Sequence, residues 1–205
     1  MNGWHFINFK IKWDKKFPVN FFVDLLIIDL LISPTIEKFK PKLILWRLHR
    51  SATEDGHILR LIFYTTPKIS EDIFKNIEAN KFYAFIKENY LEDLIRKEGS
   101  QKIEGAGDSN WPQEINKSWP YYIMGVSNMF IKLIKEVKES IADQPKENSK
   151  EELESYYKEI EKKIDEIWLK YGCHVFIHHL SAIIGYKPVT LQIRGVDSNS
   201  NGLIL

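Results

Sequence analysis

The feature that most constrains the fold is a pair of strand-like segments joined by a turn signal. Residues 42–50 and 57–66 are rich in Ile, Leu and aromatic residues, and β-branched and aromatic residues favour an extended, pleated backbone. Glu54-Asp55-Gly56 stands between the two segments, and Asp-Gly is a frequent turn sequence. We therefore expect an antiparallel β-hairpin whose loop lies at 51–56.

Residue spacing in the rest of the first half predicts what packs with this hairpin. Residues 4–13 alternate between apolar and polar, which predicts a half-buried strand of the same sheet. Asn20 precedes a run with helical spacing that we expect to stop at Ser33-Pro34, because proline disfavours helix at the preceding residue. Residues 70–96 have interrupted helical spacing and predict a second helical stretch.

The second half of the chain predicts a long loop, two amphipathic helices and a last strand at 187–194. The expected fold class is α+β, with a ferredoxin-like antiparallel sheet, helices on one face and an extra helical hairpin. The helical spacing predicts a buried face made of Ile123, Phe130, Leu133, Val137, Leu153, Ile160, Ile164 and Trp168. A single domain is expected, with sheet and first helices at 1–96, a loop at 97–118, the hairpin and last strand at 119–195 and a tail at 196–205.

The net charge, the length of the apolar runs and the number of cysteines indicate where the protein is expected to act. The net charge is +1, which predicts no general attraction to nucleic acid or to an acidic membrane. The longest apolar run, 21–33, contains Asp24 and Asp29 and is shorter than the roughly 20 residues needed to cross a bilayer, so a cytoplasmic location is expected. Cys173 is the single cysteine, which excludes an internal disulfide. It precedes His174 as in a catalytic pair, but a small buried residue is the favoured interpretation.

Arginines inside the hairpin are the most unusual local feature. If Arg50 stands opposite His57, then Arg47 stands opposite Arg60, and facing side chains have Cβ atoms about 5 Å apart. Two guanidiniums at that distance repel each other, and a bound carboxylate or phosphate would relieve the repulsion. The alternative is that Asp or Glu from a neighbouring helix neutralises them.

A histidine cluster near the C-terminus is a second candidate. His174 and His178 are four residues apart and would share a helix face, but Val175 follows His174, so the pattern is not the HExxH zinc motif. We predict no metal site and no cofactor. His178 or His179 is the favoured acid or base, because a neutral imidazole suits proton transfer near neutral pH.

The segment "LILWRLHRSATEDGHILRLIFYT" resembles a segment of thiopeptide-type bacteriocin biosynthesis proteins and of lantibiotic dehydratase elimination domains. In both of these families, an aromatic-Arg strand is followed by a short turn and a His-x-Arg-Leu strand. Here residues 51–56 replace the usual Asp-Pro turn, and the second Arg is spaced one residue differently. The resemblance implies elimination of glutamate from glutamylated Ser or Thr, with His178 or His179 as the catalytic group. It also implies that Arg47 and Arg60 hold the glutamyl carboxylate. Trp46, His49 and His57 of the same hairpin complete the candidate substrate-binding set.

A non-enzymatic role is the alternative to this lyase-type chemistry. Trp111, Trp119, Tyr121 and Tyr122 cluster around a Gly-rich loop, and such aromatics form partner surfaces as well as pocket walls. Pro120 also fits the first turn of a helix, which would make these aromatics a helix-start anchor. The expected partners are an anionic small molecule or a modified peptide, together with a separate large protein that supplies the glutamyl group, and neither a membrane nor a nucleic acid.

Overall fold

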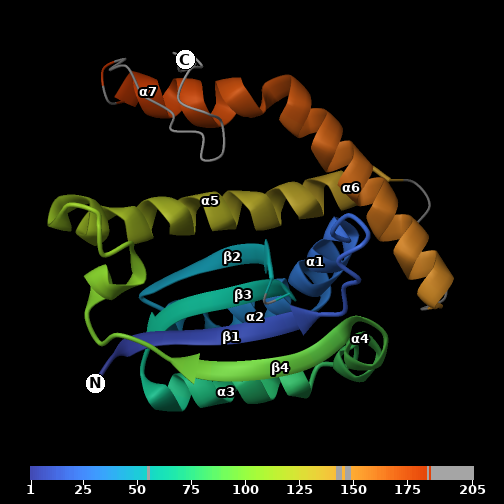
Figure 1. The fold of residues 1–205 in the computed structure, drawn as a ribbon, viewed down its shortest axis with the longest axis horizontal. Coiled ribbons are helices and arrows are strands. Elements are labelled where there is room, and N and C mark those ends of the chain that lie inside the picture. Colours follow the sequence, from blue (N-terminus) through green and yellow to red (C-terminus); the bar gives the residue numbers. More distant parts are fainter. Residues whose placement is uncertain (55, 142–144, 146–148, 184, 186–205) are drawn as a thin grey trace. The chain divides into compact units, whose positions relative to one another are not determined.

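In the computed structural model, which describes residues 1–54, 56–141, 145, 149–183 and 185, a four-stranded antiparallel sheet organises the first half of the chain. The chain divides into two compact units, Met1–Lys162 and Lys163–Leu205. The four strands belong to the first unit and lie in the order β2-β3-β1-β4 (Figure 1). This order, with a helical segment in each crossover, is the ferredoxin-like arrangement predicted from the sequence.

The strands have bounds that differ in part from the prediction. They are β1 (Gly3–Ile11), β2 (Leu45–Thr53), β3 (Gly56–Thr65) and β4 (Leu91–Glu98). The hairpin of β2 and β3 and its place in one sheet with β1 are confirmed. The turn is tighter than predicted, because Thr53 already pairs with Gly56. Gly56 has φ 109°, a left-handed conformation that glycine adopts without steric cost.

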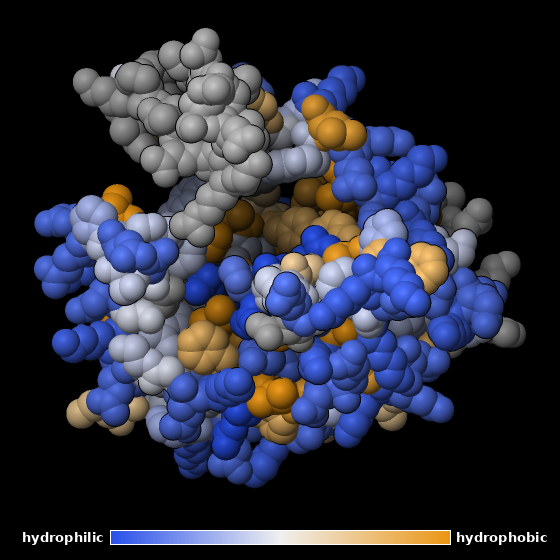
Figure 2. All heavy atoms as spheres, viewed as in Figure 1, coloured by the Kyte–Doolittle hydropathy of each residue, from blue (hydrophilic) through white to orange (hydrophobic). Residues whose placement is uncertain are grey.

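The fourth strand is β4 and not the segment at 187–194, which lies outside the described residues. We predicted helical spacing up to about Arg96, and that is wrong beyond Tyr90, where α4 ends and β4 begins. β4 is an edge strand with mostly exposed, charged side chains. Such charges are common on sheet edges, and here they mask the alternation that marks a half-buried strand. Where α3 and β4 lie in Figure 1, the surface in Figure 2 is mostly hydrophilic.

One face of the sheet packs on the helices of the crossovers. The first crossover is helical from Phe21 to Lys42, as α1 (Phe21–Ile27), a π-helical turn (Ile28–Ile32), α2 (Ser33–Phe39) and a 3₁₀ turn (Lys40–Lys42). Our prediction of a stop at Pro34 is wrong, because Pro34 lies in the first turn of α2, where its missing N–H is tolerated. The second crossover contains α3 (Pro67–Glu78) and α4 (Tyr83–Tyr90).

Apolar burial on this face supplies the main core. Each fully buried Leu, Ile or Phe contributes roughly 1.5–3 kcal/mol. The apolar side chains of β1, α1, the π-helical turn and β3 that are at most 2% exposed include Ile7, Phe9, Ile11, Leu25, Leu26, Leu31, Ile32, Leu59, Leu61 and Phe63.

The opposite face of the sheet is covered in part by α5 (Gln113–Glu139) and by a 3₁₀ turn (Ile103–Ala106). Trp4, Leu45, Ile62 and Tyr64 form a second apolar cluster there. Helix α5 also runs along the edge strand β2 (Figure 1). Ser127 of α5 accepts a hydrogen bond from the backbone N–H of Leu48 over 3.0 Å.

The described part of the chain from Gln113 to Ile183 is mostly helical, as predicted. α6 (Lys150–Gly172) is followed by a π-helical stretch (Cys173–His178) and by α7 (His179–Ile183). Of the residues predicted to be buried, Trp168 is exposed, and Ile123, Phe130 and Leu133 are partly exposed; Val137, Leu153, Ile160 and Ile164 are buried. No helix in the described part of the chain is both long enough and apolar enough to cross a membrane.

Asp24 and Asp29, the two acidic residues in the apolar run 21–33, each bind basic or hydrogen-bonding side chains from other elements. Asp29 in the π-helical turn pairs with Lys138 of α5 and accepts a hydrogen bond from Tyr157 of α6. Burial, followed by the negative charge of Asp29, raises the pKa of the Tyr157 hydroxyl, so this tyrosine remains a donor. Asp24 is 0% exposed and takes part in the network described below.

Candidate functional site

Arg47, His49 and Arg60 lie together on the face of the sheet that α5 covers. His49 is directly opposite Arg60, and Arg47 is opposite Ile62. Our prediction that Arg47 faces Arg60 is therefore wrong by two residues, because β2 runs on to Thr53 and leaves only residues 54 and 55 for the turn. A shift of two residues keeps every side chain on its predicted face, so the three basic residues still gather on one side.

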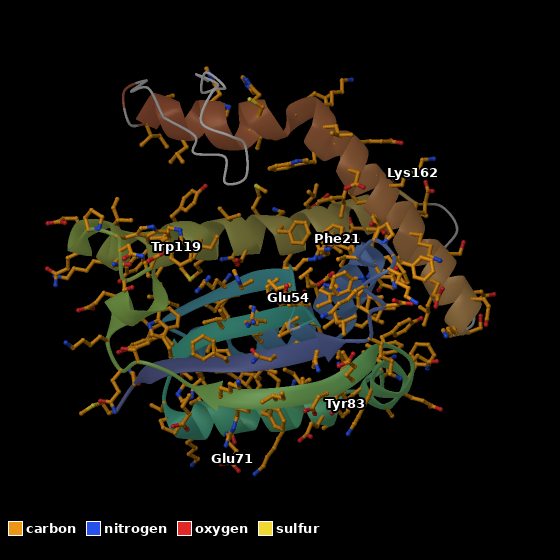
Figure 3. All side chains as sticks on the ribbon, in the orientation of Figure 1. Phe21, Glu54, Glu71, Tyr83, Trp119 and Lys162 are labelled. Carbon is orange, nitrogen blue, oxygen red and sulfur yellow. The ribbon has the colours of Figure 1, made fainter. Side chains whose placement is uncertain are left out.

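Arg47 is the deepest member of this group, with 8% of its surface exposed. Its guanidinium lies 4.5 Å from the ring centroid of Trp119, a cation–π distance. Trp119 lies on α5 (Figure 3). Burial, together with the neighbouring charge of Arg60, lowers the pKa of Arg47 to about 10. Arg47 therefore stays cationic at neutral pH, at a cost that an anion nearby would offset.

Arg60 is partly exposed, and it donates its hydrogen bond to a neutral group. Its Nη1 donates a hydrogen bond to the Ser51 hydroxyl over 2.7 Å, and burial lowers the pKa of the guanidinium. Within the described ranges, no Asp or Glu carboxylate lies within ion-pairing distance of Arg60. We considered the alternative that a neighbouring Asp or Glu neutralises the arginines. For Arg60, the described part of the chain supplies no such carboxylate.

His49 completes the cluster with a titratable ring. Burial lowers the pKa of His49, and the charges of Arg47 and Arg60 lower it further. The imidazole is therefore neutral near pH 7, where it can accept a proton. Asn8 of β1 is the other direct neighbour of Arg60, and no described group pairs with its buried Oδ1.

Trp46 and His57 lie on the opposite face of the sheet, away from this cluster. Trp46 is 3% exposed and belongs to the core. His57 is fully buried, and its Nε2 lies 2.9 Å from an oxygen of Asp24. Arg50 contacts the same carboxylate through Nε at 3.2 Å. The structure therefore assigns Arg50, His57 and Asp24 to a buried ion network, in which the charge on Arg50 is already matched.

His178 and His179 belong to the second unit and lie close to His174. The ring centroids of His174 and His178 are 4.8 Å apart, and that of His179 is 5.0 Å from His174. No three His, Cys, Asp or Glu residues among those described are arranged to hold a metal ion. Cys173 is exposed, so our prediction that it is buried is wrong. The convergence of these histidines with the arginines stays a prediction.

The aromatic segment is placed differently from the prediction. α5 begins at Gln113, so Pro120 lies inside the helix and does not start it. Trp111 and Trp119 make an edge-to-face contact with ring centroids 5.3 Å apart. Sequence reasoning treated the aromatics and the arginines as rival features, whereas Trp119 and Arg47 are in contact. It also missed Ser51, although Ser51 has the same parity along β2 as Arg47 and His49.

The fold was compared with known proteins. No family model and no curated protein matches the sequence. Among solved structures, the crystal structure of TsrL resembles this chain with a TM-score of 0.42 and 9% sequence identity. The match covers 91% of this chain and 50% of TsrL, so the chain spans about half the length of that protein.

Proposed function

We propose that this chain acts in peptide maturation of the thiopeptide or lantibiotic kind, and that Arg47 and Arg60 bind the carboxylate of a modified peptide. The observation that carries the proposal is the basic cluster on the α5 face of the sheet. Arg60 donates to a neutral hydroxyl and has no described carboxylate partner. Guanidiniums hold carboxylates through paired, charge-assisted hydrogen bonds. The resemblance of the hairpin sequence supplies the reaction class.

The proposed reaction eliminates glutamate that is esterified to a Ser or Thr side chain. A base removes the Cα proton, the electron pair forms the Cα=Cβ double bond, and the Cβ–O bond breaks. Glutamate leaves as a carboxylate, and the product is a dehydroamino acid. Arg47 and Arg60 hold the glutamyl group as negative charge develops. His178 or His179 is the proposed base, and His49 is its rival within the basic cluster.

Mass spectrometry of a synthetic peptide that carries O-glutamyl serine tests this reaction. The intact chain should convert the peptide to its dehydroalanine form, and Arg60→Ala should slow the conversion. His49→Gln is compared with the double variant His178→Gln/His179→Gln, and whichever abolishes turnover while binding persists identifies the base. A chain that neither converts nor binds the peptide would exclude the proposed function.

A non-enzymatic accessory role is the second candidate. Four apolar side chains on and before the first turns of α5 are exposed by 38% to 55%, namely Trp111, Ile115, Tyr121 and Tyr122. Aromatic side chains of this kind are enriched at protein interfaces. Binding of the peptide without any conversion, lost on substitution of Tyr121 and Tyr122 by Ser, would favour this role.

A further inference from the structure

A cavity of about 200 Å³ lies beside the basic cluster. It is formed between α1, the π-helical turn, β2, β3 and the middle of α5, and Phe21, labelled in Figure 3, is one of its wall residues. Most of its walls are apolar, contributed by Phe21, Ile28, Leu48, Leu59, Ile123, Val126 and Phe130. Phe21 and Phe130 stack with ring centroids 6.3 Å apart, so two aromatic rings form one side.

Three of the polar groups in the wall, Asp24, Arg50 and Ser127, are matched within the protein. Asp24 is paired with Arg50 and His57. The Arg50 guanidinium lies over the Phe21 ring at 4.6 Å. Ser127 accepts from the Leu48 N–H and donates to the Ile123 carbonyl. Because each charge has a counter-charge, the cavity favours a neutral apolar group over an ion.

The cavity is adjacent to the proposed anion site through His49. This residue lines the cavity and is the direct cross-strand neighbour of Arg60, so their Cβ atoms are about 5 Å apart. An extended peptide advances about 3.3 Å per residue. A ligand group in the cavity and an anion at Arg60 therefore fit neighbouring residues of one peptide.

We propose that this cavity is a specificity pocket for an apolar side chain of Leu, Ile or Phe size. The side chain would neighbour the anionic residue held by Arg60, so the proposal rests on the proposed function. The volume is adequate, since a dry cavity of about 150 Å³ lined by similar residues holds a benzene molecule. The pocket would make the chain select peptides by the residue beside the modified one.

Isothermal titration with three peptide analogues tests the pocket. In each analogue an amide replaces the glutamyl ester, and the neighbouring residue is Phe, Leu or Gly. The Phe and Leu analogues should bind about ten- to a hundred-fold more tightly than the Gly analogue, because they bury an apolar side chain. Equal affinity for all three would overturn the pocket and leave the anion site intact. Failure of all three to bind would overturn both.

Two variants with opposite expected effects sharpen the test. Val126→Trp should fill the cavity and bring the Phe and Leu analogues to the affinity of the Gly analogue. Ile123→Ala should enlarge the cavity and shift the preference toward an analogue with Trp at that position. Lys135→Trp, on the exposed side of the same helix, is the matched control and should leave the preference unchanged. If Ile123→Ala also left it unchanged, the pocket would be elsewhere.

Discussion

Basic side chains lie on both faces of the sheet, but their partners differ between the two faces. On the face packed against α1, Arg50 and His57 are matched by the buried Asp24. On the face covered by α5, Arg47 stacks on Trp119, and Arg60 donates to Ser51. The basic residues of one face therefore stabilise the fold, while those of the other are, in our proposal, stabilised by a ligand that brings negative charge. A basic residue that pairs with a carboxylate of the protein has a structural role, and in our proposal a basic residue whose partner is neutral has a binding role.

Removing the carboxylate of the structural face should have the largest effect. Asp24→Asn leaves Arg50 without its counter-charge and the fully buried His57 without the carboxylate that it contacts, and breaking a buried pair costs about 3–5 kcal/mol. We expect a loss at the lower end of that range, because the Arg50 side chain is 38% exposed and water can solvate it. Urea denaturation measures the loss, and Asp93→Asn on exposed β4 is the control. A loss equal to that of the control would remove the distinction between the faces.

Arg60→Ala should show the reverse pattern on the binding face. Affinity for a glutamyl peptide should fall about ten- to a hundred-fold, because a charged hydrogen bond contributes roughly 1.5–3 kcal/mol. The free energy of unfolding should change by less than about 1 kcal/mol, because the bond lost is to a neutral hydroxyl. Titration and thermal melting with and without ligand measure the two quantities. Arg96→Ala on β4 is the matched control, and destabilisation without a ligand effect would contradict the site.

Because of His49, the stability of the fold and the affinity for the glutamyl peptide should depend on pH in opposite directions. Its pKa is lowered in the folded chain, so below the unfolded value of about 6.5 the unfolded chain binds more protons. Stability should fall as pH decreases from about 6.5 to the lowered pKa and should level off below it. A bound carboxylate favours the protonated ring and raises that pKa, so affinity for the peptide should rise as pH decreases over the same range. His49→Gln should flatten both profiles, and an unchanged affinity profile would place the anion away from His49.

The contact between Trp119 and Arg47 should make the smallest contribution. Trp119→Phe keeps an aromatic ring under the guanidinium, whereas Trp119→Leu removes it. The difference between the two variants isolates the cation–π attraction, which we expect to be about 0.5–1 kcal/mol in thermal or urea unfolding. Variants of equal stability would show that Trp119 acts through burial alone.

The sequence predicted the sheet better than the site. Alternation of apolar and polar residues can be read within one strand, whereas the side chains that pair in a site come from distant parts of the chain. The alternation of the hairpin placed Arg47 and Arg60 on one face correctly, and a register error of two residues did not change that. Nothing in the spacing revealed that Asp24, on a helix 33 residues from His57 in the chain, would pair with Arg50 and contact His57. β4 was missed because Ile86, Tyr90 and Leu94 continue a four-residue spacing across the point where helix changes to strand.

The hydrogen bond from Leu48 to Ser127 has a consequence for how the folded chain behaves at high concentration. β2 is an edge of the sheet, and an open edge offers backbone groups on which a second molecule can add a strand. The Ser127 hydroxyl occupies the N–H of Leu48, and α5 lies along the strand where an incoming chain would pair. Helix α5 therefore protects the apolar part of β2 from aggregation, and loss of its packing would expose that edge to other copies of the chain.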